Sequence, residues 1–79
     1  MNPEIEEKAK EVFADVMLVD FDDINSATSP ATVPAWTSFN HLTLMSAVEE
    51  SFAIQLSMEE MNSIPNFGTL VQTIQEHLR

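Results

Sequence analysis

The sequence predicts an all-α protein, a four-helix bundle with a long first loop and a short third helix. Apolar residues recur at spacings of three and four in several stretches, turn-forming residues crowd the stretch between the first two, and no segment alternates as a half-buried strand would. A chain of 79 residues with 44% apolar composition can bury one modest core. We therefore expect a single domain over residues 1–79.

The first helix is predicted over residues 3–18. Asn2 can cap its start, Pro3 is tolerated at the first helical position, and the acidic residues that follow suit the positive end of the helix dipole. One apolar stripe runs along the helix, formed by Ile5, Ala9, Val12, Phe13, Val16 and Met17. The helix is therefore amphipathic and needs a partner to cover this stripe.

Residues 19–37 have no sustained period and are rich in Asp, Asn, Ser and Pro, which favour turns. A loop of this length is unusual inside a small domain unless it has a function. Apolar residues spread along the loop predict that it is pinned to the core, namely Leu18, Phe21, Ile24, Val33 and Trp36.

The second helix is predicted from a cap at Thr37 or Ser38 to about Phe52. Its apolar stripe is predicted to contain Phe39, Leu42, Met45, Val48 and Phe52, widened by Leu44 and Ala47. After this helix, Ile54 and Leu56 are expected to return to the core in an extended connection.

A short third helix is predicted over residues 58–62, because Ser57 and Glu60 have the spacing of a capping box. Pro65 disfavours helix at Ile64, and Asn66 can cap a last helix. The apolar stripe of that last helix is predicted to be Phe67, Leu70, Val71, Ile74 and Leu78.

The chain is strongly acidic, with a formal net charge of −10 at pH 7. Its basic residues are Lys8, Lys10 and Arg79, so residues 11–78 contain no Lys or Arg. Such a surface repels nucleic-acid phosphates and anionic lipid heads, and it favours partner proteins with basic patches. The charge therefore argues against nucleic-acid binding.

Cysteine is absent, which excludes disulfides, catalysis by a protein thiolate and Cys-ligated zinc. No apolar run approaches the ~18 residues of a membrane span. The early acidic residues Glu4, Glu6 and Glu7 are the reverse of a secretory signal. We expect a cytoplasmic monomer without a membrane span.

Residues 33–54 read VPAWTSFNHLTLMSAVEESFAI. A Ser at a helix start, an apolar residue after it, and acidic residues before a Phe-x-Ile resemble the acyl carrier protein pattern, in which an Asp-Ser-Leu triplet opens the second helix. The resemblance covers essentially the whole chain, including the acidic first helix, the long loop and the short third helix. Trp36, His41 and Leu42 resemble a subgroup of discrete carriers from polyketide-like or surface-glycan pathways.

This resemblance implies that Ser38 is the attachment point of 4'-phosphopantetheine, installed by a separate phosphopantetheinyl transferase, with Thr37 and Phe39 beside it. The protein would then be a non-catalytic carrier of acyl thioesters in a specialised lipid, polyketide-like or surface-polysaccharide (lipopolysaccharide) pathway. A phosphodiester at a helix start gains ~0.3 to 1 kcal/mol from the helix dipole. The partners would be acyl-loading and acyl-transferring enzymes with basic patches.

The chain departs from the family pattern at Thr37 and Thr43, where acidic residues are expected, and at Phe39, where Leu is usual. Thr37 can still cap the helix. Residues 38–48 carry no formal charge when His41 is neutral. We therefore expect partners to read hydrogen bonds and apolar contacts there.

The residues predicted to meet partners form two groups. Electrostatic docking is expected at Glu49, Glu50, Glu59 and Glu60. Partner or acyl-pocket contacts are expected at Phe39, Asn40, Met45 and Met61, and His41 is expected among the partner-contacting residues near the arm.

Other interpretations stay open from the sequence. The chain could be an unmodified helical adaptor that docks partners through the second helix, and Ser38 could simply cap that helix. Ser38 and His41 could form a nucleophile and base, but no Gly-x-Ser-x-Gly elbow is present. Residues 20–25 superficially resemble a calcium loop, yet Ile24 and Asn25 stand where a ligand and a Gly are needed.

Overall fold

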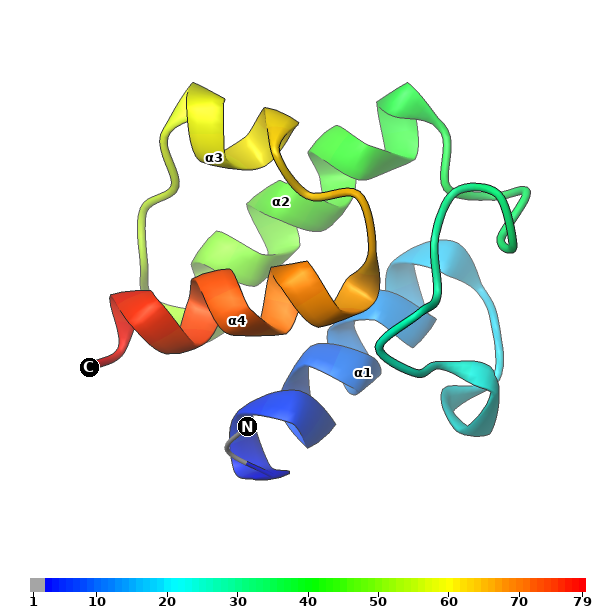
Figure 1. Cartoon of the computed structure of the whole chain (residues 1–79), viewed down its shortest axis with the longest axis horizontal. Coiled ribbons are helices and arrows are strands. Elements are labelled where there is room, and N and C mark those ends of the chain that lie inside the picture. Colours follow the sequence, from blue (N-terminus) through cyan, green and yellow to red (C-terminus); the bar gives the residue numbers. More distant parts are fainter. Residues whose placement is uncertain (1–2) are drawn as a thin grey trace.

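A computed structural model describes residues 3–79, and Figure 1 shows how the helices are arranged. They are α1 (Pro3–Met17), α2 (Ser38–Phe52), α3 (Met58–Asn62) and α4 (Phe67–His77), with a 3-10 turn η1 (Phe21–Asp23). Residues 3–79 contain no strand, so the all-α prediction is confirmed. The predicted cap at Asn2 lies outside the described residues.

Helix α1 ends at Met17, one residue before the predicted boundary, because Leu18 enters the left-handed region with a φ of 57°. The backbone N–H groups of Leu18 and Val19 both donate to the Ala14 carbonyl, at 2.8 and 3.3 Å, which satisfies the end of the helix. Leu18 is 88% exposed, and Phe21 is exposed as well. The prediction that these two residues anchor the loop to the core is therefore wrong.

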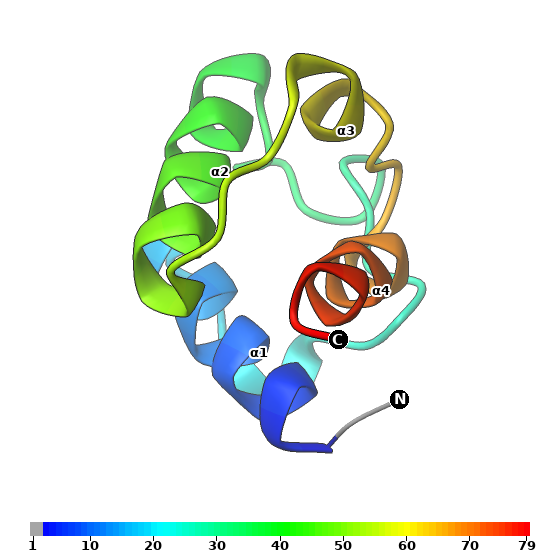
Figure 2. The ribbon, with the colours of Figure 1, turned by 90° about the vertical axis from the view of Figure 1, so that its left-hand side faces the viewer.

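Buried apolar side chains from three helices and the loops form the core, and Figure 2 shows the helices arranged around this interior. The Phe13 ring contacts Trp36 and Phe67 edge to face, with ring centroids 5.1 and 5.6 Å apart. The radius of gyration is 11.2 Å, close to the ~11.6 Å of a compact chain of this length. The core consists of Ala9, Phe13, Met17, Ile24, Val33, Trp36, Leu44, Met45, Val48, Phe52, Leu56, Ile64, Phe67, Leu70, Val71 and Ile74.

The long loop between α1 and α2 is tied to the start of α4. The N–H of Phe67 donates to the Thr28 carbonyl at 2.8 Å, and the N–H of Gly68 donates to the Ser26 carbonyl at 3.0 Å. A Cβ at Gly68 would lie only 2.9 Å from the Ser26 carbonyl oxygen, so the loop and the helix can approach this closely only because position 68 is Gly. Within the loop, Ile24, Val33 and Trp36 are buried as predicted.

The predicted apolar stripe of α2 is partly wrong. Phe39 and Leu42 are exposed, at 77% and 55%, whereas Leu44, Met45 and Val48 are fully buried. Each step of three residues falls about 60° short of a full turn, so the run from Phe39 through Leu42 and Met45 to Val48 winds about 180° around the helix. The run therefore begins on the side of α2 that faces away from the core.

The helix caps follow the predicted chemistry. Ser57 and Glu60 form the capping box of α3, and the Asn66 side chain accepts from the Thr69 N–H to cap α4. Leu78, predicted in the stripe of the last helix, lies just beyond α4 and is exposed. No helix in residues 3–79 combines the length and the apolar character that crossing a membrane requires.

Helix α2 ends in a left-handed residue that is not Gly. Ala53 has a φ of 54° and a ψ of 44°, and its N–H donates to the Glu49 carbonyl. The N–H of Ile54 donates to the same carbonyl at 3.1 Å, so the end of the helix is closed as in other left-handed C-caps.

Substitution Gly68→Ala is expected to destabilise the protein by about 1–3 kcal/mol, because the added methyl group meets backbone atoms of Ser26. Chemical denaturation measures this loss. The control is Gln72→Ala at an exposed position of the same helix, which should leave the free energy of unfolding nearly unchanged. Equal stability of the Gly68→Ala variant and the wild type would contradict the close approach.

Substitution Ala53→Gly is expected to stabilise the protein by about 0.5–1 kcal/mol. The left-handed conformation costs an L-residue about 1–2 kcal/mol, and the greater backbone entropy of Gly offsets only part of that gain. Ser46→Gly, at an exposed position inside α2, should instead destabilise by about 0.5 kcal/mol. The melting temperatures of the two variants should therefore shift in opposite directions. A shift in the same direction would contradict the left-handed conformation of Ala53.

Candidate functional site

Ser38 is the first residue of α2 and is exposed to solvent. The residue before it, Thr37, is the cap, because its side-chain oxygen accepts from the Asn40 N–H at 3.2 Å. The Ser38 hydroxyl makes no hydrogen bond to another side chain or backbone group of residues 3–79. The sequence left the cap open between Thr37 and Ser38, and the structure assigns it to Thr37.

A shallow groove of about 380 Å³ lies beside Ser38. The loop, α2 and α3 each contribute to its lining, which consists of Pro30, Trp36, Thr37, Ser38, His41, Leu42 and Asn62. Sequence reasoning missed Pro30 and Asn62 as site residues, and it placed Trp36 and Leu42 with the core. Only the tertiary fold brings Pro30 and Asn62 to Ser38, and no local motif marks either of them.

The imidazole ring of His41 joins the loop, α2 and α3. Its Nδ1 accepts a hydrogen bond from the Trp36 indole N–H at 2.8 Å, so its proton is on Nε2, which lies 2.7 Å from the Met61 carbonyl oxygen and donates to it. The rings of Trp36 and His41 are stacked, 18° from parallel. Both ring nitrogens are therefore used inside the protein, and the lone pair of the neutral ring is not available to a neighbouring hydroxyl.

The other residues predicted beside the arm take different positions. The Asn40 side-chain amide donates to the Ala35 carbonyl at 2.7 Å and is half-buried. Met45 is fully buried in the core, which excludes it from a surface that contacts partner proteins. Met61 is half-buried and packs against the core. Phe39 is therefore the apolar residue of this predicted group that is open to a partner.

The four carboxylates predicted to dock partners divide into two pairs. Glu50 and Glu59 are exposed. Glu49 accepts from the Leu56 N–H at 2.8 Å, which ties the connection after α2 back to that helix. Glu60 accepts from the Ser57 N–H at 3.0 Å and from His77 Nε2 at 2.7 Å, which ties α3 to the end of α4. Glu49 and Glu60 thus stabilise the fold whether or not they also meet a partner.

These contacts lower the pKa of Glu60 below its ordinary value of 4.5. The hydrogen bond from the Ser57 backbone N–H contributes most, and the hydrogen bond from the His77 side chain adds to it. Both contacts favour the ionised carboxylate, so the folded protein holds Glu60 as an anion more firmly than the unfolded chain does.

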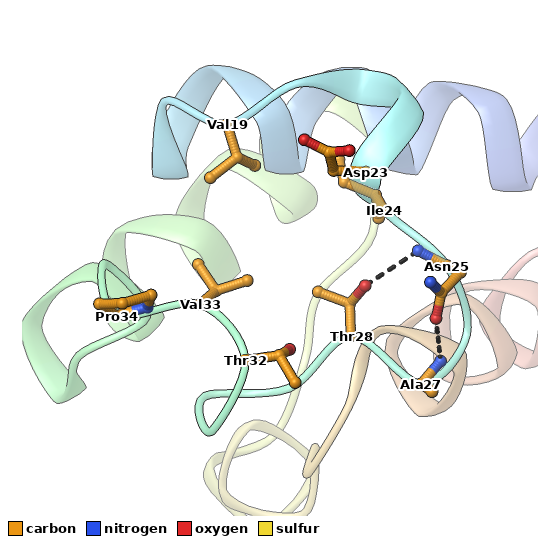
Figure 3. Close-up of a pocket in the computed structure, with 9 residues that line it drawn as sticks. All are labelled: Val19, Asp23, Ile24, Asn25, Ala27, Thr28, Thr32, Val33 and Pro34. Atoms are coloured by element: carbon orange, nitrogen blue, oxygen red, sulfur yellow. Dashed lines mark hydrogen bonds between the residues drawn. The ribbon is translucent and has the colours of Figure 1, made fainter.

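A second pocket, of about 350 Å³, lies between the end of α1 and the loop (Figure 3). Val19 and Val33 point toward one another across it, and the Asn25 N–H donates to the Thr28 hydroxyl oxygen at 2.9 Å. None of the predicted site residues lines this pocket. In the part of the chain that the structure describes, no group of three or more His, Cys, Asp or Glu residues is placed to hold a metal ion.

Comparison with protein-family models found no family that matches the chain, and no curated protein matches it. The family resemblance therefore stays a prediction from the residues of the second helix and its surroundings.

The Glu60 contacts predict a pH-dependent contribution to stability. Folding lowers the pKa of Glu60, so the ionised carboxylate stabilises the folded protein. This stabilisation is fully present above pH 4.5 and is lost as the pH falls through the lowered pKa. Glu60→Gln should therefore lower the melting temperature more at neutral pH than well below pH 4.5. Thermal unfolding across this range measures the difference.

The matched control is Glu59→Gln, which removes the same charge one residue earlier without touching Ser57 or His77. Its effect on the melting temperature should be smaller than that of Glu60→Gln at neutral pH. A Glu60→Gln effect that does not change with pH would contradict the role of the ionised carboxylate.

Proposed function

We propose that the protein is an acyl-carrier-like bundle that holds 4'-phosphopantetheine on Ser38 and shuttles acyl groups between enzymes. The single observation that carries this proposal is the division of roles at the start of α2. Thr37 makes the cap hydrogen bond, and Ser38 presents an exposed hydroxyl. A Ser that merely capped the helix would stand one position earlier and accept from the backbone itself.

The surroundings of Ser38 fit the prosthetic group. The first N–H groups of α2 have no partner within the helix and the dipole is positive there, which favours a phosphodiester on the neighbouring side chain. The groove beside Ser38 offers the stacked rings of Trp36 and His41, the apolar side chain of Leu42 and the polar amide of Asn62. These residues would hold a flexible arm that has both apolar and amide portions.

When attached, the arm supplies the terminal thiol on which acyl groups are carried. The chain has no Cys, so no protein thiol competes for those groups. The exposed Glu50 and Glu59 suit partner enzymes with basic patches. The specialised lipid, polyketide-like or surface-polysaccharide pathway implied by the resemblance is part of the same proposal.

The hydrogen bonds of His41 support a carrier rather than a serine hydrolase. A general base must accept the proton of the attacking hydroxyl, but Nδ1 of His41 already accepts from Trp36 and Nε2 donates to the Met61 carbonyl. His41 would have to break its bond to Trp36 before it could activate Ser38. We therefore propose that the protein turns over no substrate itself.

Intact-mass measurement tests the proposal. Incubation with coenzyme A and a broad-specificity phosphopantetheinyl transferase should raise the mass of the protein by one phosphopantetheine group. Ser38→Ala should abolish this shift while keeping the fold, because Thr37 still caps α2. Ser46→Ala, at an exposed position of the same helix, should keep the full shift.

An unshifted wild-type mass, or a shift that persists in Ser38→Ala, would refute the carrier proposal. If the transferase of the native host never loads the serine, and a partner protein binds Ser38→Ala as tightly as the wild type, the chain is instead an unmodified helical adaptor. Exposed Phe39 and Leu42 on α2 are the surface through which such an adaptor would bind.

A further inference from the structure

The two hydrogen bonds of the His41 ring require opposite roles of its two nitrogens. Nδ1 accepts from the Trp36 indole N–H at 2.8 Å, and Nε2 donates to the Met61 carbonyl oxygen at 2.7 Å. The His41 side chain is half-buried, and Trp36 is buried. An imidazole ring has one accepting and one donating nitrogen only while it is neutral. Both hydrogen bonds therefore exist together only in the neutral state of His41.

Protonation of His41 changes these two hydrogen bonds in opposite ways. An imidazolium carries a proton on each nitrogen, so its Nδ1 can no longer accept. The new N–H group would face the N–H of Trp36, which lies at the positive edge of the indole ring. Nε2 keeps its proton, and its hydrogen bond to the Met61 carbonyl becomes charge-assisted and stronger. One proton therefore breaks the bond to the loop and strengthens the bond to α3.

We infer that the Trp36–His41 hydrogen bond is a pH-sensitive switch in the wall of the groove beside Ser38. Neutral His41 holds the indole against α2, and protonated His41 releases it. Release leaves a buried indole N–H without an acceptor, so the indole moves or water enters beside it. Because both rings line the groove, the groove widens between them. The switch rests on these hydrogen bonds and not on the carrier proposal.

Other contacts confine the change to the two rings. The Asn40 side-chain amide donates at 2.7 Å to the carbonyl of Ala35, the residue before Trp36. The Phe13 ring contacts the Trp36 indole edge to face. Neither contact contains a group that titrates. The loop backbone therefore stays in place when His41 is protonated, and the protein remains folded.

The carboxylates of the surrounding elements are engaged elsewhere or exposed. The loop and α3 are bonded to the His41 ring, and α2 carries it; their charged residues are Asp20, Asp22, Asp23, Glu49, Glu50, Glu59 and Glu60. Within residues 3–79 none of these forms a salt bridge with His41, and none lines the groove. Glu60 is bonded to Ser57 and His77, and Glu59 is exposed. The switch therefore depends on the protonation of His41 itself.

Nuclear magnetic resonance of the full chain between about pH 8 and pH 5 tests the switch, because imidazoles take up their proton in this range. The chain has one Trp and one Gly, so the indole N–H of Trp36 and the backbone N–H of Gly68 each give a unique resonance. The Trp36 resonance should shift along the same titration curve as the ring protons of His41. The Gly68 N–H, which is bonded to Ser26, should not follow this curve.

Two variants separate His41 from the other histidine. His41→Gln has no ring to protonate and should lose the Trp36 shift. His77→Gln is the matched control, because it removes the other titrating ring and should keep the shift. If His41→Gln does not fold, the two titration curves of the wild type still decide.

Four outcomes would overturn the inference. In the wild type, they are a Trp36 resonance that stays constant while His41 titrates, and a His41 ring that stays neutral down to about pH 5. In the variants, they are a Trp36 shift that survives His41→Gln and one that is lost in His77→Gln. None of these outcomes affects the carrier proposal, which intact-mass measurement tests separately.

Discussion

The long connection between α1 and α2 has to lie against the core without an α-helix of its own, and the rest of the structure depends on how it is held. Buried Ile24, Val33 and Trp36 fix it from the inside, and the carbonyls of Ser26 and Thr28 accept the first N–H groups of α4 from the outside. These hydrogen bonds provide acceptors for N–H groups at the start of α4 that have no acceptor within the helix. The connection therefore caps one helix while it delivers Thr37 to the start of another.

Helix α3 depends on polar contacts more than on burial. None of its side chains is fully buried, although Met61 packs against the core. Hydrogen bonds add to this contact, because His41 donates to the Met61 carbonyl and Glu60 accepts from His77. Glu49 fixes the connection that leads into it through the Leu56 N–H. Such contacts open at lower free energy than a packed apolar interface. We therefore expect the α3 side of the groove beside Ser38 to move more easily than the rest of its lining.

Neighbouring residues were enough to predict where the helices begin and end. They were not enough to predict which side of each helix faces solvent. Thr37, Ser57 and Asn66 are caps that can be read from neighbouring residues, and α3 begins and ends as predicted. Phe39 was misplaced because its spacing to Leu42 and Met45 fits an apolar run that winds around the helix, and only the tertiary fold shows which part of the run meets the core. The hydrogen bonds of His41 were likewise invisible, since their partners depend on where the loop and α3 come to rest.

Trp36 is the sole tryptophan of the chain, and tyrosine is absent. Its indole is buried, bonded to His41 and part of the groove wall beside Ser38. The tryptophan fluorescence of the protein therefore comes from a single indole, which lies at the candidate site. The emission spectrum of Trp36 should therefore report changes in the contents or polarity of that groove, without any added dye or label.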